Sequence, residues 1–337
     1  MKKLVYLFAC TALFAACSSD DSNVESEVVP PVVIEPTKSK VVFSTYDNTN
    51  RISYLYELNP VDGQYEKIKE FKESEIDNLQ NFSYDATNKI FYGISSEQKL
   101  LKFDLEKKET ISIKTITPDF GVDIDYSFID KRGKMFAYGY NKMNPLLFNN
   151  FISIDKEMAT GIKGNSSKEL SKMLVGNSIF YYTYNEQQDK VVALFESFNR
   201  EADTSDFSLL LLNPTNLEEF DTQKEKNTIV IKQLDHLADT FGIVVDKNQN
   251  YYIGYEVYDE DEVAFIDTTT GELHKLFNLY SIYGMTYDKN SNSLYVFSKE
   301  KNDKVYFTAY NIDTKEKRSI ELKGNDFEVF GLTVINE

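Results

Sequence analysis

From about residue 40 onward, short apolar and aromatic stretches alternate with polar turns, and one unit recurs along the chain. In each copy an apolar strand ends at an Asp or Asn, a polar turn follows, and a second strand rich in Tyr, Phe, Ile or Val comes next. The pattern predicts a β-hairpin, because Asp, Asn and Gly satisfy or permit the backbone of tight turns. The copies cover residues 82–93, 127–138, 182–193, 242–253 and 284–295.

A second hairpin pattern alternates with the first. An apolar strand again ends in Asp or Asn, and a short polar turn leads into another strand. Six copies are present, at residues 54–60, 101–106, 151–156, 209–214, 264–272 and 309–314. Two consecutive hairpins make a four-stranded unit, which is the composition of one β-propeller blade.

The repeats predict an all-β fold, a six-bladed β-propeller over residues 40–337, and seven blades fit the count less well. The first repeat starts near Val41 and lacks an opening strand, whereas residues 330–336 match only an opening strand. We therefore expect the C-terminal strand to complete the first blade. This closure would remove the exposed sheet edges that an open array leaves as pairing hazards.

One turn carries a family resemblance. Residues 267–272 read Asp-Thr-Thr-Thr-Gly-Glu, which resembles the turn of YVTN-type and quinoprotein-like propellers. The likeness covers the repeats from about Lys40 to Glu337. It implies a fold that proteins with unrelated activities share, so it carries no functional assignment.

The N-terminus has the features of an export signal. Two lysines precede an apolar run that ends in small residues at residue 16, and this run is shorter than the roughly 20 residues that span a bilayer. Residues 13–17 (Leu-Phe-Ala-Ala-Cys) resemble the lipobox of bacterial lipoproteins. The resemblance implies a signal peptide over 1–16, cleavage before Cys17, and acylation of that cysteine by palmitate or a similar chain. An ordinary signal with a chance cysteine is the alternative.

Residues 17–39 form a predicted tether. Asp20 and Asp21 behind the cysteine resemble the surface-export signal of Bacteroidetes-type lipoproteins, which implies an outer-membrane lipoprotein facing outward. The alternative is that these acids only begin a solvated spacer. Ser, Glu and Pro dominate the rest of the segment, so we expect an extended linker.

Charge and cysteine content exclude several functions. The net charge of −17 would repel phosphates, so nucleic acid is not an expected partner, and membrane attachment depends on the lipid. Cys10 leaves with the signal and Cys17 is acylated, so the mature chain has no free thiol. Thiol catalysis, disulfides and thiolate metal sites are therefore excluded.

Metal and catalytic motifs are also missing. Residues 246–250 and 288–292 imitate the start of a calcium loop, but Tyr251 and Ser293 occupy the place of its glycine. Both segments are therefore predicted to be turns, and no metal site or cofactor is expected. The acidic run 259–262 fits a solvated loop better than a cation site. His236 and His274 have no Ser or acid at a recognisable spacing, so no catalytic residue is assigned.

Aromatic residues before glycine are the best ligand-site candidates. Phe241, Tyr283 and Phe330 each precede a glycine at the start of an opening strand, and Phe120 repeats the pair off register. Opening strands line the channel of a propeller, so these rings could stack on a sugar or another flat ligand near its mouth. The alternative is packing, with glycine allowing close backbone approach where blades converge.

The function predicted from these features is a non-catalytic binding or scaffold module at the cell envelope. Its partners would be the membrane, through the lipid, and a glycan, a peptide or an envelope protein. The alternative is an extracytoplasmic enzyme, lactonase- or lyase-like, because distant carboxylates can meet across a propeller channel.

Overall fold

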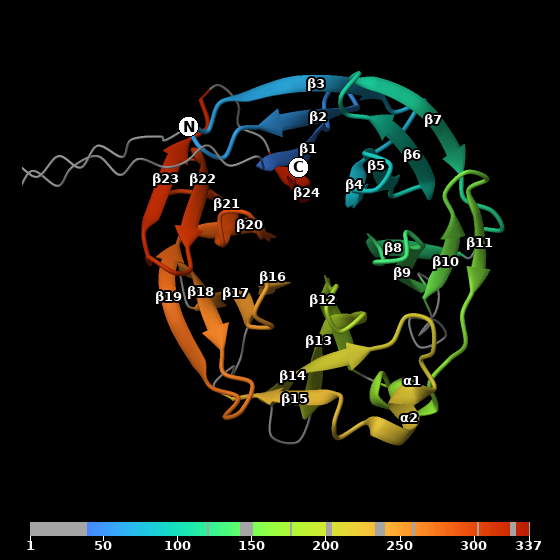
Figure 1. Cartoon of the computed structure of the whole chain (residues 1–337), viewed down its shortest axis with the longest axis vertical. Coiled ribbons are helices and arrows are strands. Elements are labelled where there is room, and N and C mark those ends of the chain that lie inside the picture. The colour runs from blue at the N-terminus through green and yellow to red at the C-terminus, as the bar shows by residue number, and fades with distance from the viewer. Residues whose placement is uncertain are drawn as a thin grey trace, which may run out of the picture. The chain divides into compact units, whose positions relative to one another are not determined.

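Antiparallel hairpins make up nearly all of the computed structural model of the protein (Figure 1). The structure describes residues 39–336 except 120, 142–150, 176, 200–203, 233–239, 258–259, 302 and 324–327. Residues 36–337 cluster as one unit, and the strands of this unit form a ring. The predicted signal and lipid site, and the tether before Ser39, lie outside the described residues.

Six four-stranded sheets, the blades, surround the ring axis. In each blade the strands are lettered A to D from the axis outward. Blade 1 contains β24 (Val329–Asn336), β1 (Ser39–Asp47), β2 (Ile52–Leu58) and β3 (Tyr65–Lys72). Blade 2 contains β4 (Leu79–Asp85), β5 (Ile90–Ser95), β6 (Lys99–Asp104) and β7 (Glu109–Thr115). Blade 3 contains β8 (Val122–Ile129), β9 (Met135–Asn141), β10 (Ile152–Asp155) and β11 (Thr160–Lys163).

The other three blades follow the same order. Blade 4 contains β12 (Ser178–Asn185), β13 (Lys190–Asn199), β14 (Thr204–Leu212) and β15 (Thr228–Ile231). Blade 5 contains β16 (Thr240–Val245), β17 (Tyr251–Val257), β18 (Glu260–Ile266) and β19 (Leu273–Leu279). Blade 6 contains β20 (Ser281–Asp288), β21 (Ser293–Lys299), β22 (Val305–Asn311) and β23 (Lys317–Glu321).

The C-terminal strand closes the ring, as the sequence predicts. Strand β24 pairs antiparallel with β1, with Phe43 opposite Leu332, and so supplies strand A of blade 1. The predicted all-β, six-bladed propeller is therefore confirmed, and a seventh blade is absent from the sheets that the structure describes.

Two short helices interrupt the repeat, and the sequence pattern did not predict them. Helix α1 (Lys168–Met173) precedes blade 4, and α2 (Glu219–Gln223) lies between its strands β14 and β15. The backbone N–H of Glu169 donates to Asp221 at 2.9 Å, which joins the two helices. Within the described part of the chain, no helix is long and apolar enough to cross a membrane.

The hydrophobic core is divided among the contacts between neighbouring blades. Side chains of a strand alternate between the two faces of its blade, so both faces of each B strand are apolar. Val192 packs between blades 4 and 5, for example, whereas Val191 beside it packs between blades 3 and 4. Blades 6 and 1 share one such cluster, around Phe43 and Phe297, which packs the closing blade against its neighbour.

The A strands run in the same direction around the axis. Equivalent residues touch between neighbours, as in the 3.1 Å contact of the Ser83 and Ser127 hydroxyls and the stacked rings of Tyr126 and Tyr182. The ring therefore has two distinct faces. The turn face carries the A–B turns, and the start face carries the first residues of the A strands.

Candidate functional site

A buried Asp or Asn ends the A strand of five blades and organises the turn face. These residues are Asp85, Asp130, Asn185, Asp246 and Asp288. Each accepts backbone N–H groups of its own turn. Asp246, for example, accepts from Asn248 at 2.7 Å and from Asn250 at 2.9 Å. This is the role expected of Asp in a tight turn, and it confirms the predicted hairpins.

The same side chains also connect neighbouring blades. Lys156 of blade 3 donates to Asp85 at 2.5 Å, and Ser39 of blade 1 donates to Asp288 at 2.7 Å. Burial alone would raise the pKa of Asp85, but hydrogen bonds from Lys156 and Asn88 outweigh it and hold the pKa below its usual value. These carboxylates are therefore already engaged as structural acceptors.

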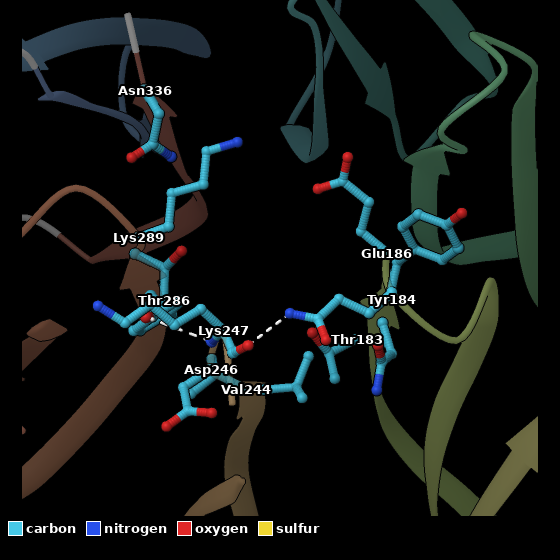
Figure 2. Close-up of a pocket in the computed structure, with 13 residues that line it drawn as sticks. Thr183, Tyr184, Glu186, Val244, Asp246, Lys247, Thr286, Lys289 and Asn336 are labelled. Carbon is cyan, nitrogen blue, oxygen red and sulfur yellow. Dashed lines mark hydrogen bonds between the residues drawn. The ribbon is translucent and has the colours of Figure 1, made fainter. Parts of the chain in front are cut away.

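A cavity of about 300 Å³ opens on the turn face (Figure 2). It lies where the A strands of blades 4, 5, 6 and 1 end. Most of the residues that line it are of polar types: they are Thr183, Tyr184, Asn185, Glu186, Gln187, Val244, Val245, Asp246, Lys247, Thr286, Tyr287, Lys289 and Asn336.

A network of amide groups holds one wall of this cavity. Asn185 donates to the Gln249 side chain at 2.8 Å, Gln249 donates to Gln187 at 2.5 Å, and Gln187 donates to the carbonyl of Lys247. The network joins blades 4 and 5 without using any charged side chain. The wall is therefore fixed before any ligand arrives.

Two tyrosines fix neighbouring turns in the same way. The Tyr287 hydroxyl accepts the backbone N–H of Lys247 at 3.3 Å and donates to Asn292 at 2.7 Å. Two blades earlier, the Tyr184 hydroxyl accepts the backbone N–H of Lys131 and donates to Asp189. Partial burial raises the pKa of both phenols, so they remain protonated donors at neutral pH.

On the opposite face, the A strand of every blade contains a β-bulge near its start. Each A strand has one residue more than its B strand there, which bends the strand and redirects a side chain. The extra residues are Asn81, Asp125, one of Phe180 and Tyr181, Phe241, Tyr283 and Phe330.

Three of the four aromatic residues predicted from the sequence fall on these bulges. Phe241 and Tyr283 are half-buried and pack against the clusters between blades 5 and 6 and between blades 6 and 1. Phe330 is exposed. Phe120 lies outside the described residues, and the bulge of its blade falls at Asp125, which fits its off-register position. Their role in ligand binding stays a prediction.

The glycines after the bulges allow close approach between blades. A Cβ on Gly331 would lie 2.8 Å from Phe82 of blade 2, and one on Gly242 would lie 2.8 Å from Met285 of blade 6. At Gly284 there is more room, because a Cβ there would lie 3.8 Å from the nearest atom, in the Leu332 side chain. In the aromatic-glycine pair, the glycine therefore allows two blades to approach closely, and the bulge redirects the aromatic ring before it.

All Phe and Tyr side chains that are exposed among the described residues lie on the start face. Tyr181 and Phe180, at the bulge of β12, were missed in the sequence because no glycine follows them. The full set is Phe180, Tyr181, Phe198, Tyr280 and Phe330. Contiguous exposed apolar patches are typical of binding surfaces, and Phe180, Tyr181 and Phe198 come from one blade.

The remaining sequence candidates have structural partners. In the acidic run, Glu262 pairs with Lys275 at 2.6 Å and Asp261 accepts the N–H of Ile282. His274 is exposed on β19 and stacks on Phe265, whereas His236 lies outside the described residues. No group of three or more His, Cys, Asp or Glu side chains in the described ranges is placed to hold a metal ion.

Comparisons with known proteins bear on the fold. No protein-family model matches this chain, and no curated protein sequence matches it. Solved structures do. TolB from Acinetobacter baumannii has a TM-score of 0.57 at 11% identity, over 88% of this chain and 68% of that one. A candidate 6-phosphogluconolactonase from Bacteroides fragilis has a TM-score of 0.55 at 11% identity, over 88% and 98%.

A third structure is the periplasmic gluconolactonase of Pseudomonas aeruginosa, with a TM-score of 0.53 at 9% identity over 88% of this chain and 99% of that one. At such identities the likeness shows the β-propeller fold alone. Since the neighbours include both TolB and lactonases, the fold is compatible with either of the functions predicted from the sequence.

Proposed function

We propose that this protein is a non-catalytic binding module of the cell envelope whose start face takes a glycan chain. The observation that carries the proposal is the gathering of exposed aromatic rings there, including Tyr181 and Phe330 at the bulges. Exposed rings cost free energy in water unless a ligand covers them. They recur on separate blades, so they could contact successive units of an extended ligand.

The chemistry of this face favours a neutral sugar polymer. The flat apolar faces of pyranose rings match aromatic side chains, which offer large contact area at low entropic cost. The net charge of −17 disfavours anionic polymers. A peptide or an envelope protein is the other occupant compatible with exposed aromatic rings.

The attachment to the envelope is part of this proposal. The lipobox resemblance around Cys17 and the acids behind it support an outer-membrane lipoprotein with the propeller facing outward. In that arrangement the tether would hold the propeller near the surface, where polysaccharides are encountered.

A lactonase- or lyase-like enzyme is the second candidate, since the fold neighbours include a candidate 6-phosphogluconolactonase and a gluconolactonase. Such chemistry would need carboxylates free to exchange protons. Asp85, Asp130, Asp246 and Asp288 all accept hydrogen bonds within their own turns, so they fit this role poorly. Glu186 in the turn-face cavity is the carboxylate that remains available.

The test uses the soluble chain beginning at Ser18. Titration calorimetry with neutral polysaccharides (dextran, laminarin, xyloglucan, arabinoxylan) should find at least one ligand. Tyr181→Ala and Phe330→Ala should each weaken its binding about tenfold or more, because truncating an aromatic residue that anchors an interface costs about 2 kcal/mol or more. Ile162→Ala is the matched control, since Ile162 is exposed on the outer strand β11.

Two outcomes would contradict the proposal. One is that no polysaccharide binds while a peptide library or an envelope protein does. The other is that the chain hydrolyses glucono-δ-lactone above the buffer rate and loses this activity in Glu186→Gln, which would establish the enzymatic alternative.

A further inference from the structure

The turn-face cavity has an arrangement of charges that the proposed glycan face does not use. Glu186, Lys247 and Lys289 occupy the same place in three consecutive blades, directly after the Asp or Asn that ends the A strand. All three are exposed and line the cavity. One blade therefore contributes a carboxylate and the next two contribute ammonium groups.

These charges lack partners within the protein. Among the residues that the structure describes, the side chains of Glu186, Lys247 and Lys289 make no ion pair and no hydrogen bond. Two other cations of this face are paired. Lys156 lies 2.5 Å from Asp85, and Arg132 lies 2.6 Å from Asp130. Three unpaired charges therefore line the cavity.

The opposite charges lie on opposite sides of the opening. In Figure 2, Lys289 extends from the β20–β21 side and Glu186 from the β12–β13 side, and both reach the same end of the cavity. The amide network of Gln187 and Gln249 and the hydroxyl of Tyr287 fix the backbone between them. Thr183, Thr286 and Asn336 add neutral hydrogen-bonding groups to the lining.

We infer that this cavity is a second binding site, for a small zwitterion of amino-acid or dipeptide size. The ligand's ammonium group faces Glu186, and its carboxylate faces Lys289. Charge-assisted hydrogen bonds of this kind are among the stronger polar contacts in proteins. The volume of about 300 Å³ lies at the small end of ligand pockets, which range from about 300 to 1,000 Å³.

The site is independent of the proposed glycan face. It lies on the turn face, whereas the bulges and exposed rings lie on the start face. Polysaccharide binding and zwitterion binding can therefore be measured separately on one protein, and failure of either leaves the other standing.

The test is titration calorimetry of the soluble chain with the free amino acids and their glycyl dipeptides at low salt. At least one should bind, and its N-acetyl and C-amide derivatives should bind at least tenfold more weakly, because each loses one charge. Lys289→Gln should weaken binding of the free ligand about tenfold and leave the affinity for the C-amide unchanged. Glu186→Gln should also weaken binding of the free ligand about tenfold and leave the affinity for the N-acetyl form unchanged.

Lys315→Gln and Glu316→Gln are the matched controls. Both residues are exposed on the outer turn of blade 6, and the two substitutions remove the same charges as those at the site. Neither should change the affinity. The inference is overturned if no member of the panel binds, if the blocked derivatives bind as tightly as the free ligand, or if the control variants weaken binding as much as the site variants. Thermal melting of each variant shows that the fold is intact.

Discussion

The carboxylate of Asp85 in blade 2 and the ammonium of Lys156 in blade 3 lie 2.5 Å apart, with only 3% and 15% of their side chains exposed. Asp85 also accepts the backbone N–H of Thr87 and Asn88, so one carboxylate serves its own turn and the contact with the next blade. The pair therefore couples a local turn to the assembly of the ring.

Removing Lys156 should destabilise the protein strongly at neutral pH. Lys156→Met leaves Asp85 buried with an uncompensated charge, which costs about 3 kcal/mol or more when one member of a buried pair is lost. The measurement is urea unfolding at pH 7. Lys89→Met is the control, because Lys89 pairs with Glu106 in an exposed bridge and should change stability little.

The same pair predicts a pH dependence. The pKa of Asp85 is lower in the folded chain than in the unfolded chain, where it is about 3.9. Its contribution to stability is therefore present above the unfolded pKa and is lost as the pH falls through the folded pKa. The stability difference between the native chain and Lys156→Met should be full at about pH 6–7. It should shrink as the pH falls, because without Lys156 the pKa of the buried Asp85 rises and the variant loses its uncompensated charge at a higher pH than the native chain. A difference that is constant with pH would contradict the role of this ion pair.

The glycines after the bulges should differ in how well they tolerate substitution by alanine. Gly331→Ala brings a Cβ to 2.8 Å from Phe82 and 3.0 Å from the Ser44 hydroxyl, so it should cost about 1–3 kcal/mol of overpacking. Gly284→Ala meets nothing closer than Leu332 at 3.8 Å and should be nearly neutral. Urea unfolding of both variants gives the comparison, and equal losses would show that the inter-blade approach is not the cause.

Tyr287→Phe should loosen the contact between blades 5 and 6. The change removes the acceptor for the Lys247 N–H and the donor to Asn292, at a cost of about 1–2 kcal/mol. Hydrogen exchange at the Lys247 amide should become faster. Tyr184→Phe should do the same for Lys131. Tyr306→Phe is the control, because it removes only a weak contact to Glu321, and the exchange rates of both amides should stay unchanged.

Cys17→Ser should yield a folded chain that is released as soluble protein. The substitution removes the thiol that the lipobox resemblance implies is acylated, and no other membrane attachment is predicted. Membrane fractionation with immunodetection makes the measurement, and Cys10→Ser should remain bound. A Cys17→Ser protein found in the membrane fraction would exclude the lipid anchor.

The sequence carried enough information for the blades because their turns are locally determined. Asp246 and Asp288 bond to N–H groups two to four positions ahead, so their spacing reveals the hairpin directly. The closing strand was also recognisable, because residues 330–336 complete what the first repeat lacks. Helices α1 and α2 were missed, since each is about one turn long and has no repeated apolar period.

The candidate sites were only partly recognisable, because they depend on pairing and on the faces of the ring. A bulge is a difference in length between two paired strands, and only where a glycine follows it, as after Phe241, did the sequence mark it. The cavity was not foreseen. Its signal was the residue after each strand-ending Asp or Asn, which is Glu186 in one blade and Lys247 in the next.

The pairing of β24 with β1 also has a consequence for the order of folding. Ser39 and Asn336 meet in blade 1 although 297 positions separate them. A chain emerging from the ribosome exposes β1 to β3 long before β24 is made, so blade 1 waits with an open inner edge while the other blades assemble. Contacts of such long range slow folding. Until β24 is made, the edge of β1 stays unpaired, and this is when a holding chaperone has most to protect.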